Sequence, residues 1–439
     1  MRIYCTNESI DNIPEGFDEK LDITNKKDIG FNFWDNYIKL EKEFSKLAID
    51  LLYLSIFVFV ADRIVKRDTQ NDGWTRTIKL NIPVSDIDFW NSQKVLVTDM
   101  LNFLSGDNWT FEFRPKTVYQ EQIYYSSKKY KELNKRSYDK ICMFSGGLDS
   151  FIGAIDLLED STSSILLVSH YGGGKGTKSY QDDIFKAVKN KYKLDDRDQV
   201  QSYVVAKNGK EDTTRTRSFM FFSHAIVYAS AFGRKTQLYI PENGYISLNV
   251  PLSGSRFGSS STRTTHPYYM KKLQTLINNM NLDIRIINPY QFKTKGEMMK
   301  ECKNSSFLKE QYVNTMSCSH PDNGRFKKEK TSKHCGDCIP CIVRKAAIIS
   351  AYGKDETEYR HKNLEKSEAG ILNRNAFLQM LEKHNPKKAV FEIQKSGPLT
   401  DNLFEFADVY NRSIEELNKI FNEVDMNEVD WFSLPSRFI

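Results

Sequence analysis

Five short apolar stretches, separated by segments of helical length, organise the middle of the chain. They are residues 141–144, 165–168, 202–206, 237–240 and 284–287. Short apolar runs of this kind are typical of strands that are buried on both faces. Strands that alternate with helices predict a parallel sheet with helices on both of its faces. The expected fold class is therefore α/β.

The two ends of the chain show other patterns. Strand-like segments at 2–6, 75–84 and 109–113, a long helix or two between residues 34 and 67, and a helix at 95–104 predict an α+β accessory domain over residues 1–130. A lysine-rich linker is expected at 121–140, and the main domain spans residues 131–352. Helical spacing at 376–383 and 413–421 predicts a helical C-terminal extension over 353–439.

Composition narrows the class of protein. The chain has 439 residues, of which 40% are hydrophobic and 27% are charged, and its net charge is +6. These values are typical of a soluble globular protein, and the modest positive charge permits an anionic ligand without requiring nucleic acid. The most apolar stretch, residues 51–61, is too short to span a bilayer. Seven cysteines and no recognisable secretion signal favour a reducing cytoplasm.

The most informative motif follows the first apolar stretch and reads Ser145-Gly146-Gly147-Leu148-Asp149-Ser150. Two glycines at a strand-to-helix turn allow backbone N–H groups to converge on an anion. Ser145 and Ser150 add hydroxyl groups, and Asp149 offers a carboxylate to a Mg²⁺ ion that accompanies a polyphosphate. The stretch has no lysine and so is not a Walker A loop. It predicts a phosphate-binding loop, and an ordinary turn is the alternative.

Four cysteines near residue 330 have the spacing of a metal site: Cys318, Cys335, Cys338 and Cys341. The two short gaps between the last three cysteines allow thiolates to surround one tetrahedral ion, so a closed structural Zn²⁺ site is expected. His334 and His320 are rival ligands, and an iron–sulfur cluster is an alternative that the spacing leaves open.

Polar segments follow the later strands, where ligands bind in parallel sheets. Arg217 begins an amphipathic helix, an unfavourable position that suggests contact with an anion, although a solvated arginine explains it equally well. Further polar residues are expected to contact a planar or anionic substrate: Glu242, Asn243, Asn249, Arg256 and Arg263. A disordered serine-rich loop is the alternative for the last three.

Residues 294–297 read Thr294-Lys295-Gly296-Glu297 and predict a capping box. Lys295 then lies in the first helical turn, where its ammonium group faces the same pocket. We expect it to neutralise a phosphate group of the anion that the glycine loop binds.

Together these segments resemble the PP-loop ATP pyrophosphatases, and among them the 7-cyano-7-deazaguanine synthase (QueC-like) branch. The resemblance covers about residues 139–352. It rests on the loop at 145–150, Tyr171-Gly172, Arg217, the segment from Pro289 to Glu297, and the four cysteines.

The resemblance implies a Rossmann-like (HUP/PP-loop) sheet that binds ATP with Mg²⁺, and structural Zn²⁺. It implies that ATP binds residues 145–150, that Asp149, Ser150, Arg217 and Lys295 are catalytic, and that Tyr171 contacts substrate. The implied substrate is 7-carboxy-7-deazaguanine, whose carboxylate receives AMP and is then attacked by ammonia.

This chain also departs from that branch. Residues 173–175 are Gly-Gly-Lys where the family usually has Gln-Arg-His, the first cysteine spacing is about twice the usual one, and residues 250–256 replace the family's substrate segment. With its added domains, the chain resembles the QueC-like proteins of bacterial anti-phage defence operons, such as the Qat system. In that setting the resemblance implies transfer of the activated group to an amine of a partner protein from the same operon.

Two other classes of function remain open at this stage. A PP-loop sulfur transferase that modifies tRNA or DNA would need a reactive cysteine, and Cys142 lies inside a predicted strand. A nucleotide-binding scaffold without catalysis is the other class. The joint presence of Ser145, Asp149 and Lys295 favours an enzyme.

Overall fold

The computed structural model describes residues 1–421, with gaps at residues 11, 161–162, 173–174, 253–262, 328, 330 and 363. Arg256, one of the expected substrate contacts, lies outside the described residues, and so does the Gly173-Gly174 pair.

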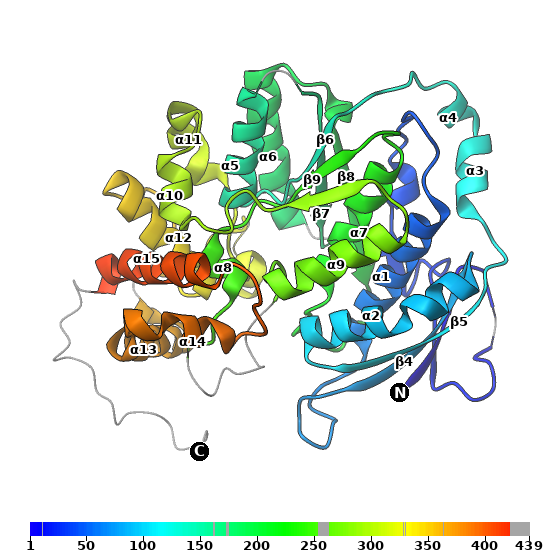
Figure 1. Ribbon diagram of the computed structural model, residues 1–439, viewed down its shortest axis with the longest axis horizontal. Helices are drawn as coiled ribbons and strands as arrows, with labels where there is room; N and C mark the ends of the chain where they lie inside the picture. Colours follow the sequence, from blue (N-terminus) through cyan, green and yellow to red (C-terminus); the bar gives the residue numbers. More distant parts are fainter. Residues whose placement is uncertain are drawn as a thin grey trace.

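A six-stranded sheet forms the centre of the molecule (Figure 1). Five of its strands are parallel: β6 (Lys140–Met143), β7 (Ile165–Tyr171), β8 (Gln199–Ala206), β9 (Thr236–Tyr239) and β10 (Ile284–Ile287). The sixth, β3 (Ile29–Phe31), pairs antiparallel with β8. All five strands expected from the apolar stretches are confirmed, and so is the α/β class.

The strands lie in the order β10–β9–β6–β7–β8–β3. Among the parallel strands, the chain first builds outward from β6 through β7 to β8. It then returns to the other side of β6 and adds β9 and β10. This is the doubly wound arrangement, in which ligands bind where the order reverses, outside the carboxyl ends of the two strands that flank the switch point. Here those strands are β6 and β9.

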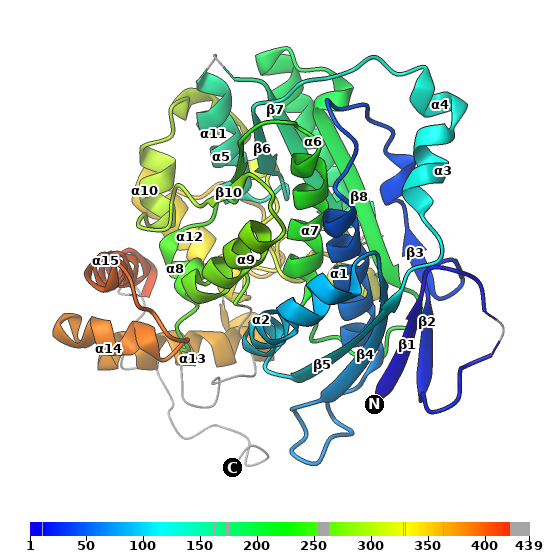
Figure 2. The ribbon, with the colours of Figure 1, turned by 45° about the vertical axis from the view of Figure 1, so that its right-hand side comes forward.

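Helices cover both faces of this sheet, and Figure 2 shows α1, α7 and α9 side by side on one of them. The face with Ile141, Met143 and Val168 packs against α1 (Lys46–Ile64), α7 (Arg217–Ser230) and α9 (Pro267–Asn279). The face with Cys142 and Leu167 packs against α5 (Leu148–Glu159) and α6 (Lys175–Tyr192). Alternate residues of β6 thus point into two separate apolar layers, as the strand period requires.

The N-terminal region contains a second, four-stranded parallel sheet in the order β2–β1–β4–β5. It is formed by β1 (Arg2–Thr6), β2 (Glu19–Asp22), β4 (Thr77–Val84) and β5 (Asn108–Pro115), with α2 (Ile87–Ser105) beside β5. The expected strands at 2–6, 75–84 and 109–113 and the helix at 95–104 are confirmed.

Two expectations for the N-terminal region were wrong. The long helix begins at Lys46 rather than near Trp34, which lies in the short 3₁₀ helix η1 (Phe33–Asp35). The backbone N–H groups of Ile38 and Phe44 donate to the hydroxyls of Tyr124 and Tyr125, so this stretch satisfies its backbone without a helix.

The second wrong expectation is the linker at residues 121–140, which contains these two tyrosines. Residues 121–140 contain α3 (Gln120–Ser126) and α4 (Lys128–Lys131), and Tyr124 is buried. This segment is therefore packed against the protein.

Residues on the two sides of position 130 share one hydrophobic core. Phe57 of α1 and Phe219 of α7 are both completely buried in it, and β3 crosses into the central sheet. The division of the chain into three domains stays a prediction.

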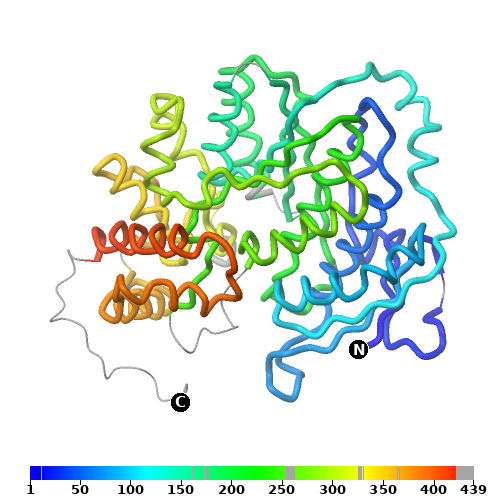
Figure 3. Tube along the Cα trace, viewed as in Figure 1, coloured from blue at the N-terminus to red at the C-terminus, as the bar shows by residue number. Residues whose placement is uncertain are grey.

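The C-terminal helices lie at the opposite end of the molecule from the N-terminal sheet (Figure 3). They are α13 (Glu368–Lys383), α14 (Ala389–Gln394) and α15 (Leu403–Phe421). Together with α8 (Gly244–Leu248) and α12 (Ile339–Tyr352) they form a further apolar cluster. None of the described helices has the length and apolar character needed to cross a membrane.

Candidate functional site

The glycine loop lies at the switch point of the sheet. It connects β6 to α5, and residues 240–244, which follow β9, lie beside it. Gly146 has φ +81°, a conformation that an L side chain rarely adopts, and a Cβ there would lie 2.8 Å from Gln181 Cγ. The glycine at this position is thus required by both the backbone turn and the close approach of α6.

Hydrogen bonds within the loop hold its shape. The Ser150 hydroxyl lies 3.0 Å from the Ser145 hydroxyl and donates to the Gly147 carbonyl at 3.0 Å. The Ser145 N–H donates to the Ser150 hydroxyl at 3.2 Å. Gln181 Nε2 of α6 donates to the Ser145 carbonyl at 2.9 Å. Ser150 therefore stabilises the turn, whereas its expected catalytic role stays a prediction.

Asp149 is the centre of a buried polar cluster. Its carboxylate forms an ion pair with Lys295, and it accepts hydrogen bonds from Asn243 Nδ2 at 2.7 Å and from the Asn243 backbone N–H at 3.1 Å. Asp149 and Lys295 are each only 6% exposed. Residues from β6–α5, from the segment after β9 and from α10 (Lys295–Lys300) therefore meet at one point.

The same cluster contains Glu242, whose Oε1 accepts a hydrogen bond from Asn243 Nδ2 at 3.1 Å. Burial, together with the adjacent Asp149 charge, raises the pKa of Glu242 well above its usual value. Burial also acts to raise the pKa of Asp149. The Lys295 ammonium and the hydrogen bonds from Glu242, Lys295 and Asn243 outweigh it and lower that pKa to about 2. The two carboxyl groups thus share one negative charge and one proton, balanced by Lys295.

The C-terminal extension holds the helix that carries Lys295. Thr294 and Glu297 form the expected capping box at the start of α10. Glu416 of α15 accepts hydrogen bonds from the Thr294 hydroxyl at 2.6 Å and from the Gly296 N–H at 3.1 Å. A carboxylate at a helix N-terminus is favourable to the helix dipole. Nothing in the local sequence around Glu416 indicated this contact.

The N-terminal region holds the helix that begins with Arg217. Asp62, near the end of α1, accepts hydrogen bonds from the Arg215 and Thr216 N–H groups at 2.8 and 2.9 Å. This buried carboxylate offsets the unfavourable arginine in the first turn of α7. The Arg217 side chain itself is exposed, and no ion pair joins it to a carboxylate in the described part of the chain.

The remaining expected substrate residues do not converge on the cluster. Arg263 donates to the Phe103 carbonyl at 2.8 Å and stacks on the Phe103 ring, so it faces α2. Asn249 ends α8 with φ +51°. Tyr171 is the last residue of β7 and packs against Tyr203 of β8. Among the described residues of that set, Glu242 and Asn243 are the ones that contact Asp149.

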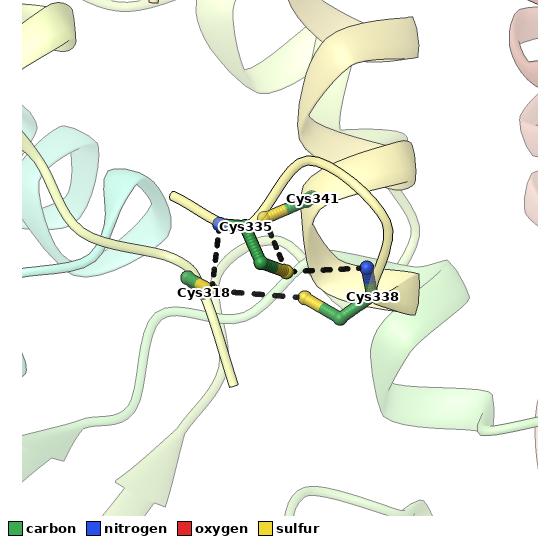
Figure 4. A group of neighbouring side chains, drawn as sticks. All are labelled: Cys318, Cys335, Cys338 and Cys341. Atoms are coloured by element: carbon green, nitrogen blue, oxygen red, sulfur yellow. Dashed lines mark hydrogen bonds between the residues drawn. The ribbon is translucent and has the colours of Figure 1, made fainter. Parts of the chain in front are cut away.

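The four cysteines meet in space, as their spacing predicted (Figure 4). Their sulfur atoms all lie within 4.8 Å of one another, with Cys318–Cys338 at 3.9 Å and Cys335–Cys341 at 3.8 Å. Four thiolates about 2.3 Å from a tetrahedral Zn²⁺ ion would be separated by about 3.8 Å. The cluster therefore fits Zn²⁺.

Backbone N–H groups also bond to the cysteine cluster, and His334 is not one of the group that surrounds a common centre. The N–H groups of Cys335 and His320 each donate to Cys318 Sγ at 3.3 Å. His334 Nδ1 lies 3.7 Å from Cys341 Sγ, and the other ring nitrogen, Nε2, bonds the Thr315 carbonyl.

The segment that leads into the metal cluster also contacts the glycine loop. The Met316 N–H donates to the Gly146 carbonyl at 2.8 Å, and the Leu148 N–H donates to the Ser317 hydroxyl at 3.3 Å. Arg344 of α12 fixes this segment by donating to the Thr315 hydroxyl at 2.7 Å. A metal ion on Cys318 would therefore stabilise the loop through two intervening residues.

Comparisons with known proteins point to one family. Residues 261–352 match the family model described as "Queuosine biosynthesis protein QueC". The matched segment includes Lys295 and all four cysteines, and it covers about a fifth of the chain. The match supports a QueC-like domain, and that family is one of PP-loop enzymes that use ATP. No curated protein matches the chain.

Proposed function

We propose that the chain transfers AMP from ATP to the carboxylate of a 7-deazaguanine and passes the activated group to a nitrogen nucleophile. The observation that carries this proposal is the glycine loop at the switch point of the sheet, with Asp149 and Lys295 in contact beside it. A loop of backbone N–H groups followed by a helix N-terminus binds phosphate. The QueC match over residues 261–352 supports the deazaguanine class of substrate.

The polar cluster suggests how the reaction proceeds. Asp149 and Glu242 would hold a Mg²⁺ ion that accompanies ATP, and the ion would offset the charge of the phosphates. In that state Glu242 would have lost its proton to water, and Lys295 would no longer be paired with Asp149. Lys295 is released toward the phosphates, where it stabilises the departing pyrophosphate together with Arg217. The carboxylate oxygen of the substrate attacks the α-phosphorus, and the bond from the α-phosphorus to the bridging oxygen breaks.

The nitrogen nucleophile then displaces AMP from the acyl adenylate. We propose ammonia or an amine of a partner protein, in a cytoplasmic anti-phage system of the Qat kind, because the chain carries regions beyond the QueC match at both ends. No step involves a membrane, and none requires nucleic acid.

The cysteines argue against sulfur transfer. Burial raises the pKa of the Cys142 thiol well above its usual range, and it raises that of Cys302 to about 12. Thiols in this state are poor nucleophiles because the thiolate is the reactive form. The four cysteines of the cluster fit a metal site instead.

The test is the release of pyrophosphate from ATP in the presence of 7-carboxy-7-deazaguanine. We expect release that depends on this substrate and falls by about a hundredfold or more in Asp149→Asn, which keeps the side-chain volume. Asp183→Asn, an exposed aspartate on α6, is the control and should retain full activity. Equal release by Asp149→Asn would refute the proposed site. Nucleotide binding with no AMP formed, even with ammonia present, would favour the scaffold.

A further inference from the structure

Strand β10 is one edge of the central sheet, and a groove with a cavity volume of about 460 Å³ lies along it. The cavity is bounded by α9, β10 and the segment that leads into α15. Its lining combines apolar and polar side chains, among them Tyr268, Lys271, Arg285, Leu399 and Phe406. Its volume lies within the range of about 300–1,000 Å³ that is common for ligand sites.

In the first half of this edge, the outward backbone groups already form hydrogen bonds with a side chain. Gln274 Nε2 donates to the Ile284 carbonyl at 2.9 Å, and Gln274 Oε1 accepts from the Ile286 N–H at 2.7 Å. The side-chain amide of Gln274 thus bonds to the carbonyl and the N–H that a residue of a neighbouring parallel strand would bond to.

The second half of the edge continues into the cavity. The carbonyls of Asp283 and Ile287 accept hydrogen bonds from the N–H groups of Thr236 in β9 and of Ile240 just after it. The carbonyl and N–H groups of the alternate residues of β10 therefore face outward. The next outward pair is the Ile286 carbonyl and the Asn288 N–H. Neither has a partner in the part of the chain that the structure describes, and both residues line the cavity.

We propose that this groove binds an extended peptide of a partner protein, which adds one short parallel strand to β10. A peptide residue offers an N–H to the Ile286 carbonyl and a carbonyl to the Asn288 N–H, which is the pairing that a small apolar ligand cannot supply. The inference is independent of the proposed reaction with ATP.

The positive charge of Arg285 in the groove favours a peptide with an acidic side chain. Lys271 forms an ion pair with Asp401 at the rim, at 2.9 Å. Arg285 is exposed, and no carboxylate of the described residues pairs with it. An acidic side chain beside the bound residue would pair with Arg285, while an apolar neighbour would contact Leu399 and Phe406.

The experiment is the selection of a phage-displayed library of random heptapeptides on the full chain. Selected peptides should combine an acidic residue with apolar neighbours. They should slow amide hydrogen exchange in the segment 284–291. Arg285→Glu should weaken their binding by about tenfold or more.

Lys387→Glu is the matched control, since it changes the charge by the same amount at an exposed site outside the groove. It should bind the selected peptides as the unchanged protein does. The proposal is overturned if no peptide is enriched, if the selected peptides bind both variants equally, or if they protect another segment. In those cases Gln274 and the basic side chains serve only to prevent pairing of this edge with other chains.

Discussion

Asp149 and Lys295 were expected to have separate roles, but in the structure each balances the charge of the other. Each side chain is 7% exposed, so the removal of one charge leaves the other buried without a partner. Lys295→Met should reduce the free energy of unfolding by about 3 kcal/mol or more, measured by urea denaturation.

The control for that variant is Lys293→Met, because Lys293 pairs with Glu301 at an exposed site and its loss should cost less than about 1 kcal/mol. The double variant Asp149→Asn with Lys295→Met should be more stable than the sum of the single changes predicts. Additive losses would mean that the two groups do not interact in solution.

Glu242 gives the site a distinctive dependence on pH. Burial and the Asp149 charge raise its pKa well above 4.5, so the folded protein retains a proton that the unfolded chain releases. The free energy of unfolding contributed by this group is therefore complete below about pH 4.3 and declines as the pH rises toward the folded pKa, by at most about 1.4 kcal/mol per pH unit.

Glu242→Gln should remove that decline, as seen in urea denaturation between pH 5 and pH 9, about the range in which carboxyls are normally ionised. The exposed Glu310→Gln is the comparison and should follow the unchanged protein. If the unchanged protein and Glu242→Gln show the same pH dependence, Glu242 is ionised in the folded state.

At the scale of elements, the cysteine cluster and the glycine loop are joined through one short segment. The segment Met316–Cys318 contacts Gly146 and Leu148 through hydrogen bonds and then enters the cluster. Loss of Zn²⁺ should therefore loosen the loop, although the metal would not touch ATP.

Cys338→Ser should lower the midpoint of thermal unfolding by on the order of 5 °C or more and speed amide exchange in residues 145–150. Cys302→Ser removes a buried thiol outside the cluster and should leave exchange in the loop unchanged. Unaltered exchange in Cys338→Ser, with zinc shown to be lost, would separate the cluster from the loop.

At the scale of the whole molecule, local sequence pattern predicted the elements of the central sheet well. It did not predict the contacts from distant residues that hold those elements in place. The five strands, the turn at Gly146 and the last three cysteines of the cluster are marked by runs, spacing and residue type within a few positions of one another. Asp62 and Glu416 reach the starts of α7 and α10 across 154 and 120 residues, and nothing in a short window signals such contacts.

The long separation along the sequence also explains why the role of the N-terminal region could not be foreseen. Its alternating pattern predicted strands correctly, but a pattern of this kind does not say what a buried face packs against. Here α1 packs on α7, the helix that carries Arg217. The N-terminal region and the C-terminal extension therefore support these helices from two sides.

These contacts predict that residues 131–352 do not fold alone. Without residues 1–130, the buried face of α7, which includes Phe219 and Tyr228, would be exposed to water, and the cap from Asp62 would be lost. Without residues 353–439, the cap from Glu416 would be lost as well. We expect the fragment to show poorly dispersed amide resonances and no cooperative thermal transition, whereas the full chain shows both dispersion and cooperativity. A dispersed spectrum with a cooperative transition would instead establish an independent domain over 131–352, to which the terminal regions are attached.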